Sequence, residues 1–410
     1  MPPHSVLLAL VLASGCAASL AGNEKETRPA DLEALKAVGG KANGLVVWTS
    51  SRAGTPHLFT MKTDGSDTRQ LTKGDATDWN PRFSPDGRKI LFSRSQEEGF
   101  VRESQGSDPG TWDLYTINVD GTEISKVVED ATWGSWFGAD EIVFMRGTRI
   151  MRTKVGGEDE AKIMDLSRYP IFDGAIVERP ELSHDGHFVA LTLAGNRRQA
   201  GIWNIKKKTW TQMGQGTQIA WAPDGASVYW IDVSGKEMNR VVREPVVAGM
   251  PADERDPEKL LLVDLGGKRS RERFPRLSND GKWLVFGAAI KSLENDLEDY
   301  ELYLWEVGSP ATSATRLTFH SANDRWPDLF VGEPGKAAAP EAAGDKGGEA
   351  KQPEEEAHVD GAKAAPAAET DETEKKEEPA AESEASDEAA PAAAGAGKPK
   401  AKVKGKKKRR

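Results

Sequence analysis

The chain has 410 residues, a formal net charge of -10 and a single cysteine. This length fits about two or three average domains, or one large all-β domain with tails. One cysteine excludes an internal disulfide framework, and no run beyond the N-terminus is long and apolar enough to span a bilayer as a helix. Most of the acidic charge lies in the last part of the chain, so it says little about the globular part.

The N-terminus carries a short apolar run, VLLALVLASG, at residues 6–15. It is too short for a membrane span and predicts the core of a signal peptide over residues 1–15. The residues that end it, Ala13-Ser14-Gly15-Cys16, resemble the lipobox of bacterial lipoproteins. The resemblance implies that Cys16 is the first mature residue and carries acyl chains. Ordinary signal-peptide cleavage after Ala21 is the alternative.

The resemblance to lipoproteins also implies a location. Ala17 follows Cys16 where an inner-membrane retention signal usually has Asp, so the outer membrane is expected. Several acyl chains together give a stable anchor, whereas one alone is marginal. The next residues, 16–44, predict a polar tether with a helix of about two turns, which Asp31 caps and Gly39-Gly40 stops.

A pattern of strand, tight turn and strand then recurs along the chain. Its clearest copy is NPRFSPDGRKILFSRS at residues 80–95, in which Pro85 sets φ, Asp86 can bond the backbone two residues on, and Gly87 tolerates a positive φ. Further copies lie at 181–193, 220–231 and 276–288, with a degenerate copy at 135–147. The turn residues, interpreted as structural, are Asp86, Gly87, Asp185, Gly186, Asp224, Gly225, Asp280 and Gly281.

The repeats predict a closed ring. Residues at equivalent first-strand positions recur at intervals near or above the ~40–50 residues typical of propeller blades. They are Phe83, Trp136, Leu182, Trp221, Leu277 and Leu329. Three opening strands from residue 45 lack a first strand, and DRWPDLF at 324–330 is a first strand without its hairpin.

Joined together, these two half-repeats complete one blade. The sequence therefore predicts an all-β, six-bladed β-propeller over residues 45–332, closed by a shared first and last blade. The short unit at 135 leaves five or seven blades open. A stacked β-solenoid, the alternative architecture, would not need complementary half-repeats at its two ends.

The repeat also resembles a known family. The pattern has a first strand, then S-P-D-G, then an apolar strand, then L-Y-x-(I/V/M)-(D/N)-x-D-G, and finally R-L-T. This order resembles the WD40-like repeats of TolB and the propellers of prolyl-oligopeptidase-type enzymes. LFTMKTDGSDTRQLT at 58–72 is a close match, and the resemblance covers about residues 45–330. It implies a TolB-like six-bladed propeller lipoprotein. TolB has an N-terminal α/β domain before its propeller, and this sequence has only the short tether there.

No linear motif predicts catalysis, a metal site or a cofactor. The sequence contains no G-x-S-x-G, no H-E-x-x-H and no Cys/His cluster. His184 and His187 flank Asp185, and we favour a plain turn over a metal site there. Twelve Trp suggest a stacking surface, but most lie at blade-packing positions, and only Trp133 and Trp210 are less constrained by the pattern.

Long loops are the better functional signal. Two polar, acidic insertions fall between second and third strands, at 95–110 and 289–299, where propellers place loops on one face. Such loops on a rigid scaffold often bind partners, although a neutral solvated insertion is the alternative. A third insertion, 246–258, is expected on the opposite face.

The C-terminal segment, residues 333–410, is rich in Ala, Glu, Pro and Lys and is expected to be disordered. Its end, KPKAKVKGKKKRR, is basic and should bind polyanions. Behind a signal peptide, the polyanion is an anionic envelope polymer or lipid and not a nucleic acid.

These observations favour a non-enzymatic cell-envelope lipoprotein whose propeller is a protein-binding platform. The alternative is a carbohydrate-active or hydrolytic propeller with a site at the central channel, which would be indicated by charged residues with shifted pKa values at one channel mouth. A third hypothesis is a wall linker that acts through its tail.

Overall fold

The computed structural model describes residues 25–102, 105–195, 197–234, 239–246, 261–266, 271–290, 296 and 299–335. The predicted signal peptide, Cys16, the tail beyond residue 335, and most of the 246–258 and 289–299 insertions lie outside these residues. A division into compact units places the boundary at Ala342, and the second unit, Ala343–Arg410, lies wholly outside them.

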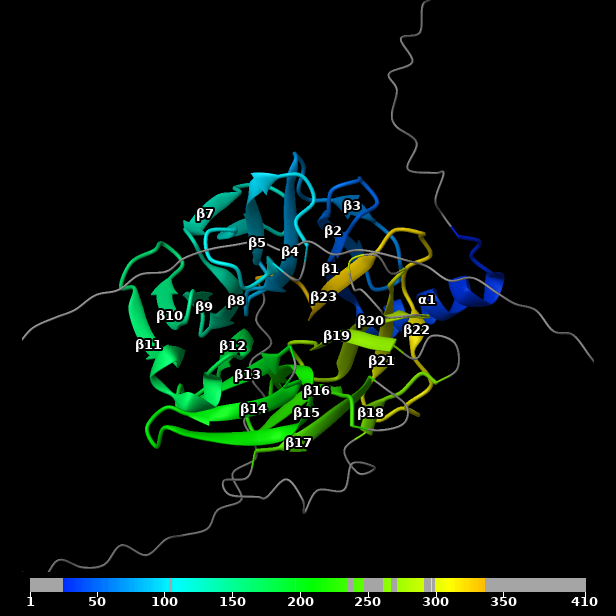
Figure 1. Cartoon of the computed structure of the whole chain (residues 1–410). Coiled ribbons are helices and arrows are strands. Elements are labelled where there is room, and N and C mark those ends of the chain that lie inside the picture. Colours follow the sequence, from blue (N-terminus) through cyan, green and yellow to red (C-terminus); the bar gives the residue numbers. More distant parts are fainter. Residues whose placement is uncertain are drawn as a thin grey trace, which may run out of the picture. The chain divides into compact units, whose positions relative to one another are not determined.

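The strands form six four-stranded blades around a central axis, each blade counted here from its innermost strand outward (Figure 1). Blade 1 consists of β23 (Asp324–Val331), β1 (Gly44–Ser50), β2 (His57–Lys62) and β3 (Arg69–Gln70). Blade 2 consists of β4 (Ala76–Phe83), β5 (Lys89–Glu98), β6 (Trp112–Asn118) and β7 (Ser125–Val128). Blade 3 consists of β8 (Thr132–Phe137), β9 (Glu141–Arg146), β10 (Arg149–Lys154) and β11 (Ala161–Asp165). Blade 4 consists of β12 (Ile176–Leu182), β13 (Phe188–Ala194), β14 (Gln199–Asn204) and β15 (Thr209–Trp221). Blade 5 consists of β15 again, β16 (Ser227–Asp232), β17 (Arg240–Pro245) and β18 (Leu261–Val263). Blade 6 consists of β19 (Arg271–Leu277), β20 (Trp283–Ala289), β21 (Glu301–Glu306) and β22 (Thr315–Arg316).

Strand β15 belongs to two blades. Its first part pairs with β14, for example Trp203 opposite Trp210, and its second part pairs with β16, for example Trp221 opposite Val228. Blades 4 and 5 therefore form one seven-stranded sheet. The count of six blades that the repeats predict is confirmed.

The predicted closure is confirmed as well. Strand β23, the last strand of the chain, pairs antiparallel with β1, the first, with Leu45 opposite Phe330 and Val46 opposite Leu329. The two half-repeats thus make blade 1, and the ring is held shut by a hydrogen-bonded ladder.

Every innermost strand carries a β-bulge at the same place. Each ladder shifts register there, and the bulged residue has a positive φ, which is uncommon for a residue other than glycine. These residues are Asn80, Trp133, Arg179, Gln218, Phe274 and Trp326. A bulge bends the strand and re-aims its side chains, so this sixfold feature shapes the centre of the ring.

The repeat turns have one local geometry. In the first copy, the Ser84 hydroxyl and the Arg88 N–H both donate to Asp86 Oδ1, and Gly87 has φ +71°. A Cβ on Gly87 would lie 2.7 Å from the Phe330 ring, so the turn also touches the neighbouring blade. The glycines of the other three turns, Gly186, Gly225 and Gly281, have positive φ too.

Helix α1 (Pro29–Ala42) differs from the short helix expected in the tether. It begins one turn earlier, with Arg28 as N-cap and Asp31 at the third helical position, and it runs through Gly39-Gly40 to Ala42. The predicted stop is wrong, and Gly39 has a different reason: a Cβ at this position would lie 2.3 Å from Asp64 Cβ, so no larger residue fits there.

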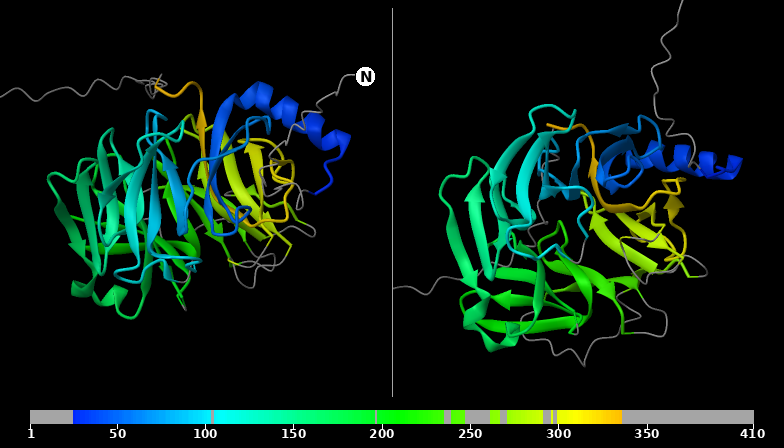
Figure 2. Two further views of the ribbon diagram at one scale, coloured as in Figure 1. Left: turned by 90° about the horizontal axis from the view of Figure 1, so that it is seen from above. Right: turned by 45° about the horizontal axis from the view of Figure 1, so that its top comes forward.

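The helix is docked and not a free tether. Its buried residues, Leu35, Val38 and Ala42, pack in one cluster with strands of blades 1 and 6 (Figure 2). Upstream of it, Lys25 Nζ bonds Asp299 and Glu301 of blade 6. The helix therefore covers the seam where the ring closes. No helix in the described part of the chain has the length and apolarity needed to cross a membrane.

Candidate functional site

The blades present two faces. The loops from second to third strands and the connections between blades lie on one face, here named the 2–3 face. The loops from first to second and from third to fourth strands lie on the other, named the 1–2 face. The 95–110 insertion belongs to the 2–3 face, although its residues 95–98 extend strand β5 instead of forming loop.

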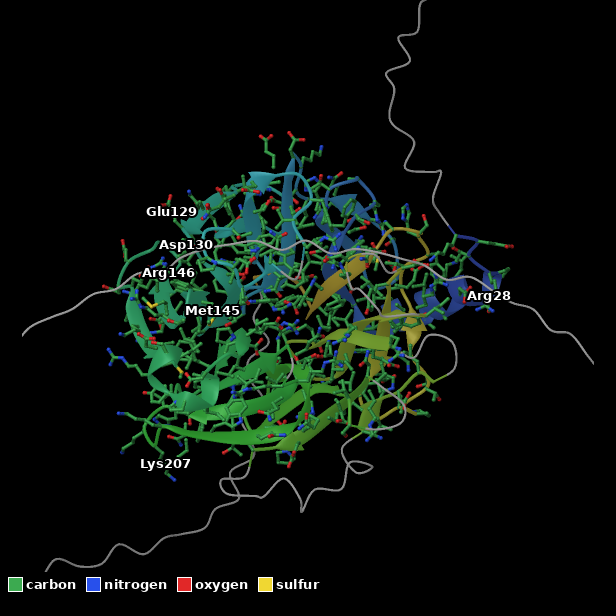
Figure 3. All side chains as sticks on the ribbon, viewed as in Figure 1. Arg28, Glu129, Asp130, Met145, Arg146 and Lys207 are labelled. Carbon is green, nitrogen blue, oxygen red and sulfur yellow. The ribbon has the colours of Figure 1, made fainter. Side chains whose placement is uncertain are left out.

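A cleft of about 480 Å³ opens on the 2–3 face above blade 3. It lies between the 95–110 insertion and the connections on either side of blade 3, one of which contains the short 3-10 helices η3 (Leu166–Arg168) and η4 (Pro170–Phe172). Apolar side chains line its floor: Trp112, Met145, Leu166, Phe172 and Val177. Figure 3 labels Met145 and the rim residue Asp130 on this side of the ring.

The rim of the cleft is acidic. Asp108, Asp130 and Asp173 are all exposed there, and no Lys or Arg is among the described residues that line the cleft. Ile176, also at the rim, is 49% exposed although it is a large aliphatic residue. A mostly apolar cleft with a few polar groups is typical of a binding site, and the exposed carboxylates on the rim would attract positive charge.

The loop of the insertion is fixed to the ring. The Trp133 indole N–H donates to Ser107 Oγ at 2.9 Å, and the Trp112 indole N–H donates to Gln105 O at 3.0 Å. Val101 is buried in the cluster that fills the centre of the ring. The described residues on either side of positions 103–104 are therefore held beside both the cleft and the channel.

Aromatic side chains close the central channel. Trp79, Trp133 and Trp326 come from three different blades, and their ring centroids lie 4.7–5.7 Å apart. Phe274 of a fourth blade lies 4.4 Å from Trp326, and the Arg179 guanidinium of a fifth lies 4.2 Å from the Trp326 ring. This aromatic plug (Trp79, Trp133, Phe274 and Trp326) lies at the level of the bulges.

A charged ring follows the plug toward the 1–2 face. It consists of Arg82, Glu181, Arg276 and Asp328, each from a different blade. Arg276 pairs with Glu181 at 2.5 Å, and Asp328 Oδ2 accepts the backbone N–H of Phe83 at 2.8 Å. The first contact links the innermost strands of blades 4 and 6, and the second links those of the neighbouring blades 1 and 2.

Burial shifts the pKa of groups in the charged ring. It lowers the pKa of Arg82 to about 9, and it raises the pKa of the Asp328 carboxyl even though Arg82 and Arg276 oppose that change. The pKa of the nearby Tyr229 phenol is also raised by burial. A catalytic site in the central channel would be indicated by charged residues with shifted pKa values at one channel mouth. Such a cluster is present here, toward the 1–2 face.

Comparison with known proteins decides the fold family. The crystal structure of TolB from Acinetobacter baumannii superposes with a TM-score of 0.50 at 14% identity, over 72% of this chain and 68% of that one. The fold is that of a TolB-like β-propeller. At this identity the likeness shows the fold alone.

The sequence relatives of this TolB-like chain match short segments. The Tol-Pal system protein TolB of Geobacter metallireducens is 39% identical over 59 residues, which is 14% of each chain. An uncharacterized protein of Agrobacterium fabrum is 27% identical over 93 residues, 22% of this chain and 27% of that protein. The matched segments are thus well under a third of those relatives. No family model matches the chain.

The residues singled out in the sequence lie away from the cleft or outside the described part of the chain. The four Asp-Gly turns all lie on the 1–2 face of the TolB-like propeller, away from the cleft. His187 Nδ1 lies 3.1 Å from Asp185 Oδ2, and no group of three or more potential metal ligands occurs among the described residues. Cys16 lies outside them.

The aromatic plug was not predicted from the sequence. Trp79 and Trp326 were assigned to blade packing, and Trp133 to no defined position. A signal was present: each bulged residue stands three residues before an equivalent first-strand position, and four of the six are followed by proline. The prolines are Pro81, Pro180, Pro275 and Pro327.

A buried carboxyl group makes the stability of the propeller depend on pH. Burial raises the pKa of Glu272 in β19 to about 8 from its ordinary 4.5, although Oε1 accepts the Leu265 N–H at 2.7 Å. Between these values the native state holds a proton that the unfolded state has lost. The free energy of unfolding should therefore fall as pH rises from about 5 to 8, by up to about 1.4 kcal/mol per pH unit.

Glu272→Gln, which mimics the protonated group, should remove that part of the slope. Urea unfolding at pH 5.5, 6.5 and 7.5 measures it, with the exposed Glu97→Gln as control. If the free energy of unfolding depends on pH in the same way in the wild type, in Glu272→Gln and in Glu97→Gln, the carboxyl of Glu272 does not cause the slope and the prediction is wrong.

Proposed function

We propose that this protein is a non-enzymatic cell-envelope lipoprotein whose propeller binds another protein through the cleft on the 2–3 face. The observation that supports this most is the cleft itself, with five apolar side chains on its floor and three exposed aspartates on its rim. A chain segment with one apolar side chain flanked by Lys or Arg fits that chemistry. The TolB-like fold supports a place in the envelope.

Two exposed isoleucines on opposite faces give a matched test. Ile176→Glu adds a carboxylate at the rim of the cleft, and Ile124→Glu does the same in a loop on the 1–2 face, where Ile124 is 46% exposed. After cross-linking in intact cells and affinity capture, the amount of partner captured with Ile176→Glu should be at least about tenfold lower than with the wild type, as for a binding hot spot. Ile124→Glu should capture as much as wild type.

Other outcomes of this capture point elsewhere. Loss with Ile124→Glu alone would place the partner on the 1–2 face. Capture that depends only on residues 336–410 would make the propeller a spacer and favour the wall-linker hypothesis. Recovery of no protein at all would contradict a protein-binding platform.

The lipid anchor at Cys16 is part of the same proposal. It is supported by the lipobox-like residues that precede the cysteine. Cys16→Ser should move the protein from the membrane fraction to the soluble fraction, because the acyl chains supply the anchor. A Cys16→Ser protein that stays with outer membranes would contradict the anchor. The basic residues 398–410 would then be tested as a second contact with an anionic polymer or lipid.

The charged ring favours the second candidate, a carbohydrate-active or hydrolytic propeller, because pKa-shifted charges gather at one channel mouth. The same groups also have structural partners: Glu181 pairs with Arg276 and accepts the Trp221 N–H, and Asp328 accepts the Phe83 N–H. Release of sugar from envelope glycans that is lost in Glu181→Gln, at unchanged stability, would support this candidate over the first.

A further inference from the structure

The N-terminal end of the described chain is fixed to the 2–3 face. Lys25 Nζ bonds Asp299 and Glu301, each at 2.6 Å, and the Lys25 backbone N–H donates to Phe319 O at 2.8 Å. Asp299 lies in the loop from the second to the third strand of blade 6, and Glu301 begins that third strand. Phe319 lies in the connection from blade 6 to blade 1. All three partners of Lys25 therefore belong to the 2–3 face.

This attachment shortens the tether that the sequence suggests. A tether over residues 16–44 could extend for up to about 100 Å, at 3.3–3.6 Å per residue. Helix α1 is docked on blades 1 and 6, and Lys25 is bound upstream of it. Only the nine peptide units from residue 16 to residue 25 then separate Cys16 from the ring, and they span at most about 30 Å.

So short a connection favours one orientation on a bilayer to which Cys16 is anchored. Strand β20 of blade 6 has seven residues and is therefore about 23 Å long, without the turns at its ends. With the 1–2 face on the bilayer, Lys25 would be lifted by at least that height, and the connection would have to be almost fully extended. With the 2–3 face on the bilayer no such extension is needed, so less conformational entropy is lost.

The side chains of the 2–3 face suit a partner of defined chemistry. Phe100, Ile176 and Ile290 are large apolar residues on this face, and they are 47%, 49% and 53% exposed. The three aspartates on the rim of the cleft would be repelled by anionic lipid head groups and attracted to Lys or Arg. The rim thus favours a basic protein segment over the lipid surface itself. Lys and Arg beside apolar residues recur at the ends of membrane-spanning segments.

Given the lipid anchor at Cys16, on which this inference rests, we propose that the 2–3 face is the membrane-proximal face of the propeller. The cleft on that face then binds an apolar segment of a membrane protein, flanked by Lys or Arg, where that protein meets the bilayer.

Energy transfer to the bilayer tests the orientation. Phe100 on the 2–3 face and Ile124 on the 1–2 face belong to the same blade and are similarly exposed, at 47% and 46%. Phe100→Cys and Ile124→Cys each add one free thiol for a donor dye, because lipid attachment blocks Cys16, the only cysteine of the chain. The full-length lipidated proteins are reconstituted into vesicles that carry an acceptor on the lipid head groups. Transfer from position 100 should be at least about twofold more efficient than from position 124, because the length of a strand, roughly 20–25 Å, separates the two faces.

A lengthened connection is the control for this experiment. A spacer of about 20 residues between Glu24 and Lys25 extends the maximum reach to about 100 Å and should remove most of the difference between the two positions. Equal transfer from both positions without the spacer, or more transfer from position 124, would overturn the proposed orientation. Release of Cys16→Ser from the same vesicles tests the anchor separately, so a failure of the anchor and a failure of the orientation are distinguishable.

A photo-reactive amino acid at position 176 tests the partner in intact cells. Its adduct should contain a peptide that carries Lys or Arg and lies next to a membrane-spanning or lipid-modified segment of the partner. The same amino acid at position 124 should not give this adduct. A peptide from a soluble protein would leave the protein-binding proposal intact but overturn a membrane-protein partner. An adduct with lipid alone, or no adduct, would overturn this inference as well.

Discussion

A chain truncated after Asn323 is expected to lose the folded propeller. The truncation removes β23, so β1 loses its inner partner and becomes an open edge. It also removes Trp326, Leu329 and Phe330, all at most 2% exposed. Burial of three such side chains contributes on the order of 5–8 kcal/mol, which is comparable to the whole free energy of unfolding of a typical domain.

A chain truncated after Gly335 is the matched control, because it keeps β23 and removes only residues outside the described part of the chain. Circular dichroism and thermal unfolding compare the two proteins. The longer one should unfold cooperatively near the wild-type Tm, and the shorter one should show no cooperative transition. If both unfold at the same temperature, the pairing of β1 with β23 does not hold the ring closed.

Trp326→Ala is expected to destabilise the propeller by about 3–5 kcal/mol, at the upper end for a single core substitution. The indole contacts Trp79, Trp133 and Phe274 and carries the Arg179 guanidinium on its face. Its removal leaves a cavity where side chains from five blades meet, and the neighbouring strands are too rigid to fill it.

Trp210→Ala is the comparison, because Trp210 lies in β15 at the outer edge of blade 4 and is only partly buried. Measured by urea unfolding, the loss in the free energy of unfolding for Trp210→Ala should be at least about 2 kcal/mol smaller than the loss for Trp326→Ala. Equal losses for the two variants would mean that the aromatic plug contributes no more than an ordinary blade contact.

The blades could be predicted because their signals are local. Pro85, Asp86 and Gly87 favour a tight turn through their own backbone preferences, and the apolar residues after them favour a buried strand. Repetition of that unit predicts the number of blades. The complementary half-repeats at residues 45 and 324 predict the closure, because a lone first strand must find the blade that lacks one.

The helix shows where local signals fail. Its polar composition suggests a tether, and Gly39 suggests a stop. Gly39 is instead required by contact with Asp64, and Leu35 and Val38 are buried by strands of blades 1 and 6. Residues far apart in sequence made both contacts, and tertiary packing routinely overrides helix propensity.

The candidate sites depend on the same distinction. The repeat unit, encoded within about 15 residues at a time, determined the strands, the turns, the six blades and the loop face on which the 95–110 insertion lies. Three-dimensional convergence decided the rest. The aromatic plug, the charged ring and the acidic cleft each combine side chains from three or more segments. The bulged residues Trp133, Arg179 and Trp326 come from three blades and contact one another at the plug. Such side chains meet only when the ring closes, because their distances along the chain carry no information about their distances in space.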